Sequence, residues 1–286
     1  MKFAPFDYVC TRSLAEVYDL IEARGPDARI LAGGQSLLTT LALRLSEPSV
    51  LLDIGGLQEL RFIEERNGAI HVGALTRHCE LETSPLIAAR LPLIAQAMPH
   101  VAHAAIRNRG TIGGSLSLAD PAAELPACML ALDAAIVLAS RDGERRVRAE
   151  AFFKGLYHTD ARPGELLVRV EITPLEKEWR FHFAEFSRRR GDYAMVGLAA
   201  AARGPGRLPE ELRLAFLGCG DRPVRAREAE RVASGSASAP RAERYSALRR
   251  ALEKDLEPQS DPNASSETRM HLAAVLADRA IEALSG

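Results

Sequence analysis

The stretch Ile30-Leu-Ala-Gly-Gly-Gln-Ser-Leu37 decides the fold of this chain. An apolar run enters it, two glycines follow, and a Gln-Ser pair precedes a second apolar segment, an order typical of a buried strand, a tight turn and a helix start. Gly33 and Gly34 can take positive φ and let a ligand approach the main chain, and Ser36 can cap the helix that follows. Free backbone N–H groups at such a turn favour an anion, most often a phosphate, although a plain turn has the same pattern.

A second Gly-Gly pair lies in the stretch Thr111-Ile-Gly-Gly-Ser115, again beside hydroxyl side chains. Asp120-Pro121 follows, and this pair predicts a helix with Asp at the N-cap and Pro at the first helical position. Glu124 then falls in the first turn, where a negative charge is favoured. The two glycine turns can close on one diphosphate from two sides, or they can be unrelated turns, and their spacing alone leaves both readings open.

Composition excludes several classes of function. The chain has 286 residues, 47% of them hydrophobic and 26% charged, which is typical of a soluble globular protein of one large or two ordinary domains. The formal net charge of −1 gives no electrostatic reason to expect nucleic acid or an anionic membrane as a partner. The N-terminal residues contain no apolar signal region, and no apolar run approaches the ~20 residues that span a bilayer. We therefore expect neither a signal peptide nor a transmembrane segment.

Metal and nucleophile chemistry are not expected from this chain either. Its four cysteines, Cys10, Cys79, Cys128 and Cys219, are widely spaced without a Cys-x-x-Cys pair, so the sequence predicts reduced thiols and no metal or iron–sulfur ligands. The seven histidines are scattered, and no Ser-His-Asp order occurs. We predict no catalytic residue in this chain.

The first part of the chain alternates helices and strands. Ser13 caps a predicted helix over 13–24, strands are expected over 29–32 and 50–54, and Thr76 is a predicted N-cap for a short helix that ends at Leu81. Hairpins are indicated by an Asn-Gly turn within 60–73 and an Asp-Gly turn within 134–147, and a strand by 165–172. This order predicts an α/β arrangement.

A polar joint over 174–178 separates a second region of α+β character. Strands are expected over 181–186 and within 209–220, and helices over 225–233, 241–256 and 266–284, with a Ser/Ala-rich loop over 233–240. We predict a domain boundary at this joint, which gives domains 1–175 and 178–286.

Two motifs carry a family resemblance. Ala32-Gly-Gly-Gln-Ser36 and Thr111-Ile-Gly-Gly114 resemble the paired flavin-binding motifs of the FAD-binding (medium) subunit of the molybdenum hydroxylases. The carbon monoxide dehydrogenase medium subunit is the nearest type, and the xanthine dehydrogenase FAD domain is the related fused form. The stretches 189–196, 218–225 and 266–284 resemble the same family in the same order, so the likeness covers nearly the whole chain.

The resemblance implies a fold. Residues 1–175 form a two-subdomain FAD-binding region of the PCMH type, with subdomains of about 1–57 and 58–175. Residues 178–286 form a smaller α+β C-terminal domain of the carbon monoxide dehydrogenase flavoprotein type.

It also implies a function. The chain holds FAD without a covalent bond, in a heterotrimer that can dimerise, with a large molybdopterin-binding subunit and a small [2Fe–2S] subunit. Substrate is oxidised on another subunit, and electrons pass from the clusters through FAD to an external acceptor. The expected location is cytoplasmic, or peripheral on the inner membrane face through the complex.

Residues of the cofactor site carry over by position. The first loop and its flanks hold the diphosphate, the second loop faces them, two acids lie near the FAD sugar or ribityl hydroxyls, and an aromatic ring lies near the isoalloxazine. These residues are Arg29, Ala32, Gly33, Gly34, Gln35, Ser36, Leu37, Thr111, Ile112, Gly113, Gly114, Ser115, Asp120, Glu124 and Tyr193. Ser115 and Leu118 stand where relatives often have Asn and His, so hydrogen bonds from those side chains are missing.

Two alternative functions, and the role of one basic cluster, stay open. A stand-alone flavin-dependent oxidoreductase on the same scaffold needs its own acid or base in the second domain, and a scaffold that has lost FAD needs no intact glycine loops. The basic cluster Arg188–Arg190 fits a partner contact, an effect on the flavin potential, or a solvated turn.

Overall fold

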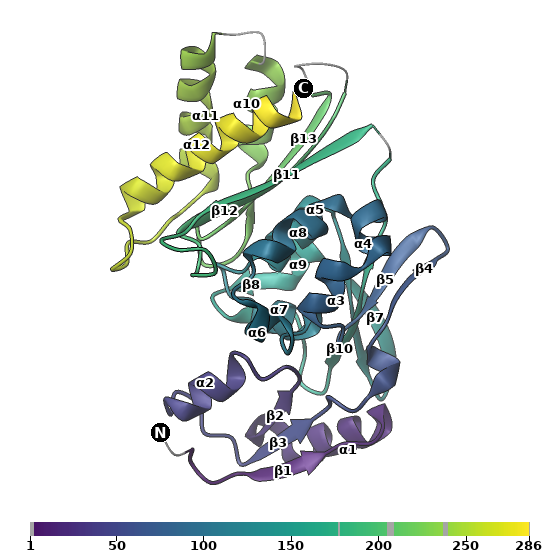
Figure 1. The fold of residues 1–286 in the computed structure, drawn as a ribbon. Coiled ribbons are helices and arrows are strands. Elements are labelled where there is room, and N and C mark those ends of the chain that lie inside the picture. The colour runs from purple at the N-terminus through teal and green to yellow at the C-terminus, as the bar shows by residue number, and fades with distance from the viewer. Residues whose placement is uncertain (1–2, 177, 205–208, 237–239, 286) are drawn as a thin grey trace.

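The computed structural model describes residues 3–176, 178–204, 209–236 and 240–285. Three lobes follow one another along the chain (Figure 1): an N-terminal lobe to residue 57, a middle lobe to residue 176, and a C-terminal lobe from residue 178. Each lobe is built on a sheet of its own. Among the described residues no helix combines the length and the apolar character that crossing a bilayer requires.

The N-terminal lobe is a parallel three-stranded sheet in the order β1-β3-β2, with the buried strand β3 at its centre. The predicted helix after Ser13 is confirmed, because the Ser13 hydroxyl accepts the N–H of Glu16 at 3.2 Å. Parallel strands end at one edge, so the segments after β2 and β3 lie side by side. Its elements are β1 (Asp7–Cys10), α1 (Leu14–Arg24), η1 (Gly25–Asp27), β2 (Ala28–Leu31), α2 (Leu37–Ala42) and β3 (Val50–Asp53).

The middle lobe is a five-stranded sheet in the order β4-β5-β10-β6-β7. Helices cover one face, and Val137, Leu166 and Val168 on the other face pack against Val17 and Ile54 of the N-terminal lobe. This shared core fixes the two lobes relative to each other. The elements are η2 (Gln58–Leu60), β4 (Ile63–Arg66), β5 (Ala69–Gly73), α3 (His78–Thr83), α4 (Pro85–Arg90), α5 (Pro92–Ala97), η3 (Met98–His100), α6 (Ala104–Arg107), α7 (Ile112–Leu118), α8 (Glu124–Ala131), β6 (Ala135–Ser140), β7 (Gly143–Arg148), α9 (Ala149–Phe152), β8 (Phe153–Gly155), β9 (His158–Thr159) and β10 (Leu166–Ile172).

Both predicted hairpins are confirmed, since β4 pairs with β5 and β6 pairs with β7. Asn67 and Gly68 have φ of 52° and 78°, the two positive values that a tight hairpin turn of this type requires.

Two predicted helix caps in the middle lobe are wrong. Helix α3 begins at His78, and the Thr76 hydroxyl donates instead to the Phe62 carbonyl at 2.8 Å. Helix α8 begins at Glu124, and Asp120 lies in the preceding turn, where its carboxylate accepts the N–H of Ala122 at 2.9 Å. The reason is that α7 ends in a left-handed residue, Ala119 with φ 53°, so the chain must reverse before a new helix can begin.

The C-terminal lobe is an antiparallel sheet in the order β11-β12-β13-β14 between two layers of helices. Helices α10, α11 and α12 lie on one side of it, and α5 and α8 of the middle lobe pack on the other (Figure 1). Strand β12 is buried on both faces, and four of its eight residues are alanine, which lets both helix layers approach. The elements are β11 (Trp179–Phe186), β12 (Val196–Arg203), β13 (Glu211–Leu217), β14 (Val224–Arg225), α10 (Arg227–Ser236), α11 (Arg241–Asp255) and α12 (Ser266–Leu284).

The predicted loop over 233–240 is wrong in its first part, because α10 continues to Ser236. Residues 237–239 lie outside the described residues. The sequence predicted no strand over 196–203, and β12 occupies this segment.

Candidate cofactor-binding site

The first glycine loop is an open cradle of backbone donors. It leaves β2 at the carboxyl edge of the parallel sheet, and Gly34 takes the left-handed φ of 76°. The N–H groups of residues 33–36 donate to no acceptor among the described residues. The Gln35 amide donates to the Gly33 carbonyl at 3.1 Å, which ties the loop to itself. Adjacent unpaired N–H groups of this kind form a site for an anion.

The predicted cap by Ser36 is wrong. Ser36 has φ −101° and ψ −47°, so its backbone is already helical, and its side chain makes no capping hydrogen bond to α2. A capping side chain needs an extended backbone at that position.

The second glycine loop has a different hydrogen-bonding state. Thr111 caps helix α7 by accepting the N–H of Gly114 at 3.1 Å. The N–H of Ile112 donates to Thr76 O at 3.0 Å, and that of Gly113 donates to Ala74 O at 2.9 Å. The backbone donors at the start of α7 are therefore used inside the protein.

The two loops touch each other through Gly33. A Cβ atom at this position would lie 2.3 Å from the carbonyl oxygen of Arg109, so only glycine fits the contact. This close approach brings Thr111 and the side chain of Arg109 beside the first loop.

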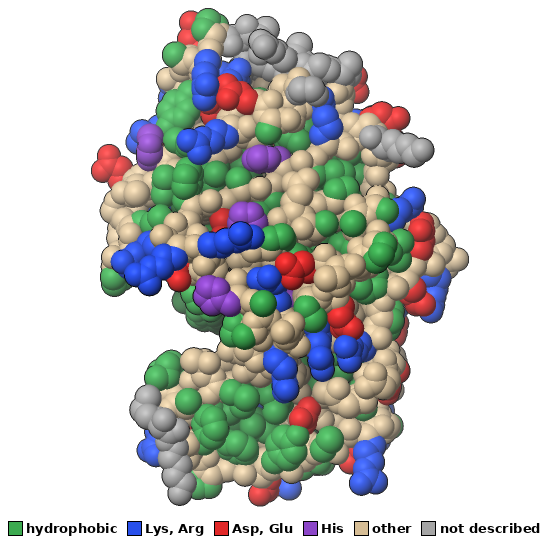
Figure 2. Space-filling view, in the orientation of Figure 1, with side chains coloured by type: hydrophobic (Ala, Val, Ile, Leu, Met, Phe, Trp, Pro, Cys, Tyr) green, Lys and Arg blue, Asp and Glu red, His purple; other side chains and the backbone are tan. Residues whose placement is uncertain are grey.

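A cavity of about 230 Å³ lies where the N-terminal and middle lobes meet. Ala32, Gly33, Gly34 and Thr111 line it, as predicted site residues, together with residues that the sequence reasoning missed. The missed residues are Leu31, Leu38, Asp53, Gly55, Gly56, Arg61, Leu75, Arg77 and Arg109. Figure 2 shows the molecule hollowed between the N-terminal lobe and the rest of the chain.

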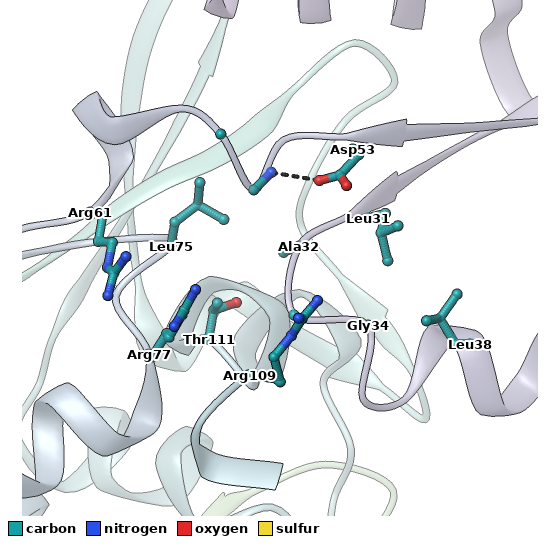
Figure 3. Close-up of a pocket in the computed structure, with 13 residues that line it drawn as sticks. Leu31, Ala32, Gly34, Leu38, Asp53, Arg61, Leu75, Arg77, Arg109 and Thr111 are labelled. Atoms are coloured by element: carbon teal, nitrogen blue, oxygen red, sulfur yellow. Dashed lines mark hydrogen bonds between the residues drawn. The ribbon is translucent and has the colours of Figure 1, made fainter. Parts of the chain in front are cut away.

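Three arginines give the cavity a positive wall (Figure 3). Arg61 is neutralised by Glu80, whose carboxylate lies 2.8 Å from Nη2. Arg77 and Arg109 form no ion pair among the described residues, although the charge of Arg77 helps to lower the pKa of Glu80, and Figure 3 shows both arginine side chains at the cavity. Neither arginine belongs to a glycine motif: Arg77 directly precedes helix α3, and Arg109 stands two residues before Thr111.

Other predicted site residues lie away from this cavity. The Arg29 guanidinium turns to the carbonyls of Pro26, at 2.7 Å, and Ala28, at 3.0 Å. Gln35, Ser36 and Leu37 continue the first loop into α2. Ile112 and Gly113 are buried behind the second loop, and Gly114 and Ser115 lie in the same turn of α7.

Two acids and two tyrosines form a second group of side chains, outside the lining of the cavity. Asp120 and Glu124 are both 9% exposed, and burial raises the pKa of both carboxyls, that of Glu124 to about 7. Tyr193 is 71% exposed. Partial desolvation and the charge of Asp120 raise the pKa of Tyr193 and of Tyr157 at the β8–β9 turn, so both rings lie near this acid. The sequence reasoning missed Tyr157.

Among the described residues no group of three or more His, Cys, Asp and Glu side chains is placed to hold a metal ion. Unpaired amides, two free guanidinium groups and a nearby pair of acids with tyrosine rings fit a ligand that carries phosphate, hydroxyls and a flat ring. This combination offers the groups that a nucleotide-type cofactor would need.

Comparisons with known proteins agree with that class. Residues 4–175 match the family model described as the FAD binding domain in molybdopterin dehydrogenase, and residues 181–284 match the CO dehydrogenase flavoprotein C-terminal domain. The chain belongs to the FAD-binding medium-subunit family of the molybdenum hydroxylases, and the resemblance found in the sequence is confirmed.

Relatives of known name span the whole chain. It is 38% identical to the 6-hydroxypseudooxynicotine dehydrogenase complex subunit alpha of Paenarthrobacter nicotinovorans, over 98% of this chain and 95% of that protein. A chain in the structure of quinoline 2-oxidoreductase from Pseudomonas putida 86 matches with a TM-score of 0.92 and 40% identity, over 100% and 98% of the two chains. A chain of the carbon monoxide dehydrogenase from Hydrogenophaga pseudoflava matches with a TM-score of 0.94 and 33% identity, over 99% and 98%.

The fold class, the oxidoreductase assignment and FAD as the cofactor are thereby confirmed.

Proposed function

We propose that this chain takes electrons from a [2Fe–2S] subunit and passes them through FAD to an external acceptor. The observation that carries the proposal is the cavity between the lobes. It is lined by Gly33 and Gly34, which belong to the loop whose N–H groups have no acceptor among the described residues, and by Arg77 and Arg109, in a chain of an FAD-binding family. The FAD that this site would hold accepts and donates electrons, while the chain supplies placement and electrostatics.

The diphosphate is proposed to bind at the first loop. Four open amides and two guanidinium groups suit two phosphates, because arginine forms strong hydrogen bonds to phosphate oxygens. The second loop contributes mainly as the wall that holds Thr111 and Arg109 against Gly33. Arg29 is kept in the proposal only as a residue near the loop, since its guanidinium is turned to main-chain carbonyls.

The redox ring is proposed to lie at the acid and tyrosine group. Asp120 and Glu124 would accept hydroxyl hydrogen bonds from the ribityl chain, and Tyr193 would shield a ring face. Because Glu124 is buried with a raised pKa, a hydroxyl donor would satisfy a group that water reaches poorly.

The partners are proposed to be a large molybdopterin-binding subunit and a small [2Fe–2S] subunit. The name of the Paenarthrobacter relative describes a subunit of a dehydrogenase complex, which supports a multi-subunit assembly. We propose a cytoplasmic complex, soluble or attached to the inner membrane face. Residues 1–175, with subdomains of about 1–57 and 58–175, are proposed as the FAD-binding domain, and residues 178–286 as the C-terminal domain.

The test is to purify the full chain and record its visible spectrum before and after addition of FAD. We expect a flavin spectrum with one FAD per chain, and co-purification of two further subunits when the neighbouring genes are expressed together. A colourless chain that takes up no FAD would overturn the proposal. Reduction of the flavin by an organic substrate with the chain alone would instead favour a stand-alone flavoenzyme.

A further inference from the structure

Asp53 is a carboxylate in a cavity whose other charged groups are arginines. It ends strand β3 and lines the cavity across from Arg77 and Arg109 (Figure 3). One carboxylate oxygen accepts the N–H of Gly55 at 2.8 Å, and the other accepts the hydroxyl of Tyr8. Asp53 forms no ion pair with any arginine of the described chain. Nothing in the proposed diphosphate site uses this side chain.

The chemistry of the side chain narrows what it can bind. An ionised carboxylate accepts about four hydrogen bonds, and only two are made here, so each oxygen keeps accepting capacity. A phosphate beside it would be repelled. A metal cation is disfavoured by the arginines, and the described residues place no group of three acidic, His or Cys ligands together. Hydroxyl donors are the remaining match, and a pair of adjacent hydroxyls suits the two oxygens.

The topology places this acid one strand away from the phosphate cradle. Leu31, the last residue of β2, lies opposite Asp53 in the parallel ladder, and the N–H of Ile54 donates to Leu31 O at 3.0 Å. Asp53 also follows Gly33 by 20 residues (53 − 33). In parallel sheets that bind dinucleotides, an acid at about this separation from the glycine turn binds ribose hydroxyls while the turn holds the diphosphate.

We infer that Asp53 binds the ribose hydroxyls of the adenosine half of FAD, and that Tyr8 is a positioning residue for its carboxylate. The inference rests on the proposed function, since it needs the diphosphate at the first loop. It divides the acids between two sugars: Asp53 takes the ribose, and Asp120 and Glu124, which follow the C-terminal end of α7, take the ribityl chain. The Gly55 N–H and the Tyr8 hydroxyl hold the carboxylate from both sides, so little side-chain freedom is lost on binding.

The experiment compares ADP with 2′,3′-dideoxy-ADP on the flavin-free full chain, with competition against FAD as the readout. We expect the unsubstituted chain to bind ADP about 10- to 100-fold more tightly than the dideoxy analogue, as for hydrogen bonds to a charged group. In Asp53→Asn this ratio should fall to within about threefold, because the charge that strengthens the hydroxyl bonds is gone. Asp27→Asn, an exposed acid of the same lobe, should keep the full ratio.

Tyr8→Phe separates positioning from structure. It keeps the ring and removes the hydroxyl that holds Asp53, so the ADP to dideoxy-ADP ratio should fall partway while the melting temperature changes little. An unchanged ratio in Asp53→Asn, with or without a lower melting temperature, would make Asp53 a turn residue only and overturn the inference. Failure of ADP to compete with FAD at all would overturn the proposed diphosphate site, and the inference with it.

Discussion

The two glycine loops share a Gly-Gly pair near a serine, and their hydrogen-bonding states are opposite. In the first loop, Gly33 to Ser36 leave their N–H groups without an acceptor among the described residues. In the second, the N–H groups of residues 112–114 donate to acceptors inside the middle lobe. The glycines also serve different purposes. Gly33 permits the contact between the loops, and Gly113 permits α7 to pack on Ala74, whose Cβ would lie 2.6 Å from an added Cβ.

This difference shows that a Gly-Gly motif alone does not predict a phosphate-binding loop, because its N–H groups can be used inside the protein. The first loop is proposed to bind the anion, and the second to hold the residues that face it. Substitutions in the two loops should therefore separate cofactor affinity from stability.

The largest effect is expected from Gly33→Val. The new side chain meets the Arg109 carbonyl and forces the loops apart, so FAD affinity should fall by more than about 100-fold while most secondary structure remains. Flavin absorbance after gel filtration measures the FAD that stays bound, and far-ultraviolet circular dichroism measures the secondary structure. Gly56→Val is a comparison within the same cavity lining, and it should lose less FAD, because its Cβ would meet only Thr11 O at 4.0 Å and would not separate the loops. Retention of full FAD by Gly33→Val would remove the first loop from the site.

The segment after the second loop is expected to show a pH effect. Burial raises the pKa of Glu124 to about 7, so between its ordinary value near 4.5 and pH 7 the folded chain keeps a proton that the unfolded chain releases. The free energy of unfolding should then fall as pH rises through this window, by about 3 kcal/mol for this group. In Glu124→Gln that contribution disappears. Urea unfolding at several pH values measures it, and equal pH slopes in both proteins would contradict the assignment.

Arg109→Gln should weaken FAD binding by about 10- to 100-fold, because it removes a hydrogen-bonding charge from the diphosphate. Its affinity should also depend less on salt than that of the unsubstituted chain. Arg61→Gln provides the internal control in the same cavity, since Glu80 already neutralises Arg61. Titration calorimetry at two salt concentrations compares the FAD affinities of Arg109→Gln and Arg61→Gln. Equal losses in both variants would mean that the field of the cavity, and not Arg109 itself, attracts the phosphate.

Gly113→Ala should lower stability more than cofactor affinity. The added methyl group overlaps Ala74 in a packed interior, which costs about 1–3 kcal/mol of unfolding free energy. FAD affinity of the folded fraction should change by less than about fivefold, or 1 kcal/mol. Thermal melts and flavin titration give the two quantities. A loss of FAD as large as that of Gly33→Val would erase the distinction between the loops.

The smallest effect is expected from Gln35→Ala. It removes the 3.1 Å hydrogen bond from the Gln35 amide to the Gly33 carbonyl and leaves the backbone donors in place. The loop becomes less ordered, so FAD affinity should fall by about two- to tenfold, in line with the ~0.5–1.5 kcal/mol of a neutral hydrogen bond. Fluorescence titration is sensitive enough. A loss comparable to that of Arg109→Gln would indicate that the Gln35 side chain itself contacts the cofactor.

Local sequence was sufficient where local chemistry dominates. Ser13 with Glu16 fixed the start of α1, and Asn67-Gly68 fixed the first hairpin, because both depend on a few neighbouring residues. It failed at β12, since alanines favour helix and only burial between two helix layers makes this segment a strand. It also failed at Asp120, where the end of α7 decided where α8 could begin.

By itself, the sequence determined the family, the cofactor class and the two glycine loops that carry them, because those depend on residue type and order. Only the tertiary structure decided which loop keeps free N–H groups. The carbonyls of Thr76 and Ala74, which lie outside the second glycine motif, accept the N–H groups of that loop. Only the packing of two lobes on one core brought Arg77, Arg109 and Asp53 to the same cavity. Charges from three separate segments meet there, and the positions of Arg77 and Arg109 along the chain do not predict that meeting.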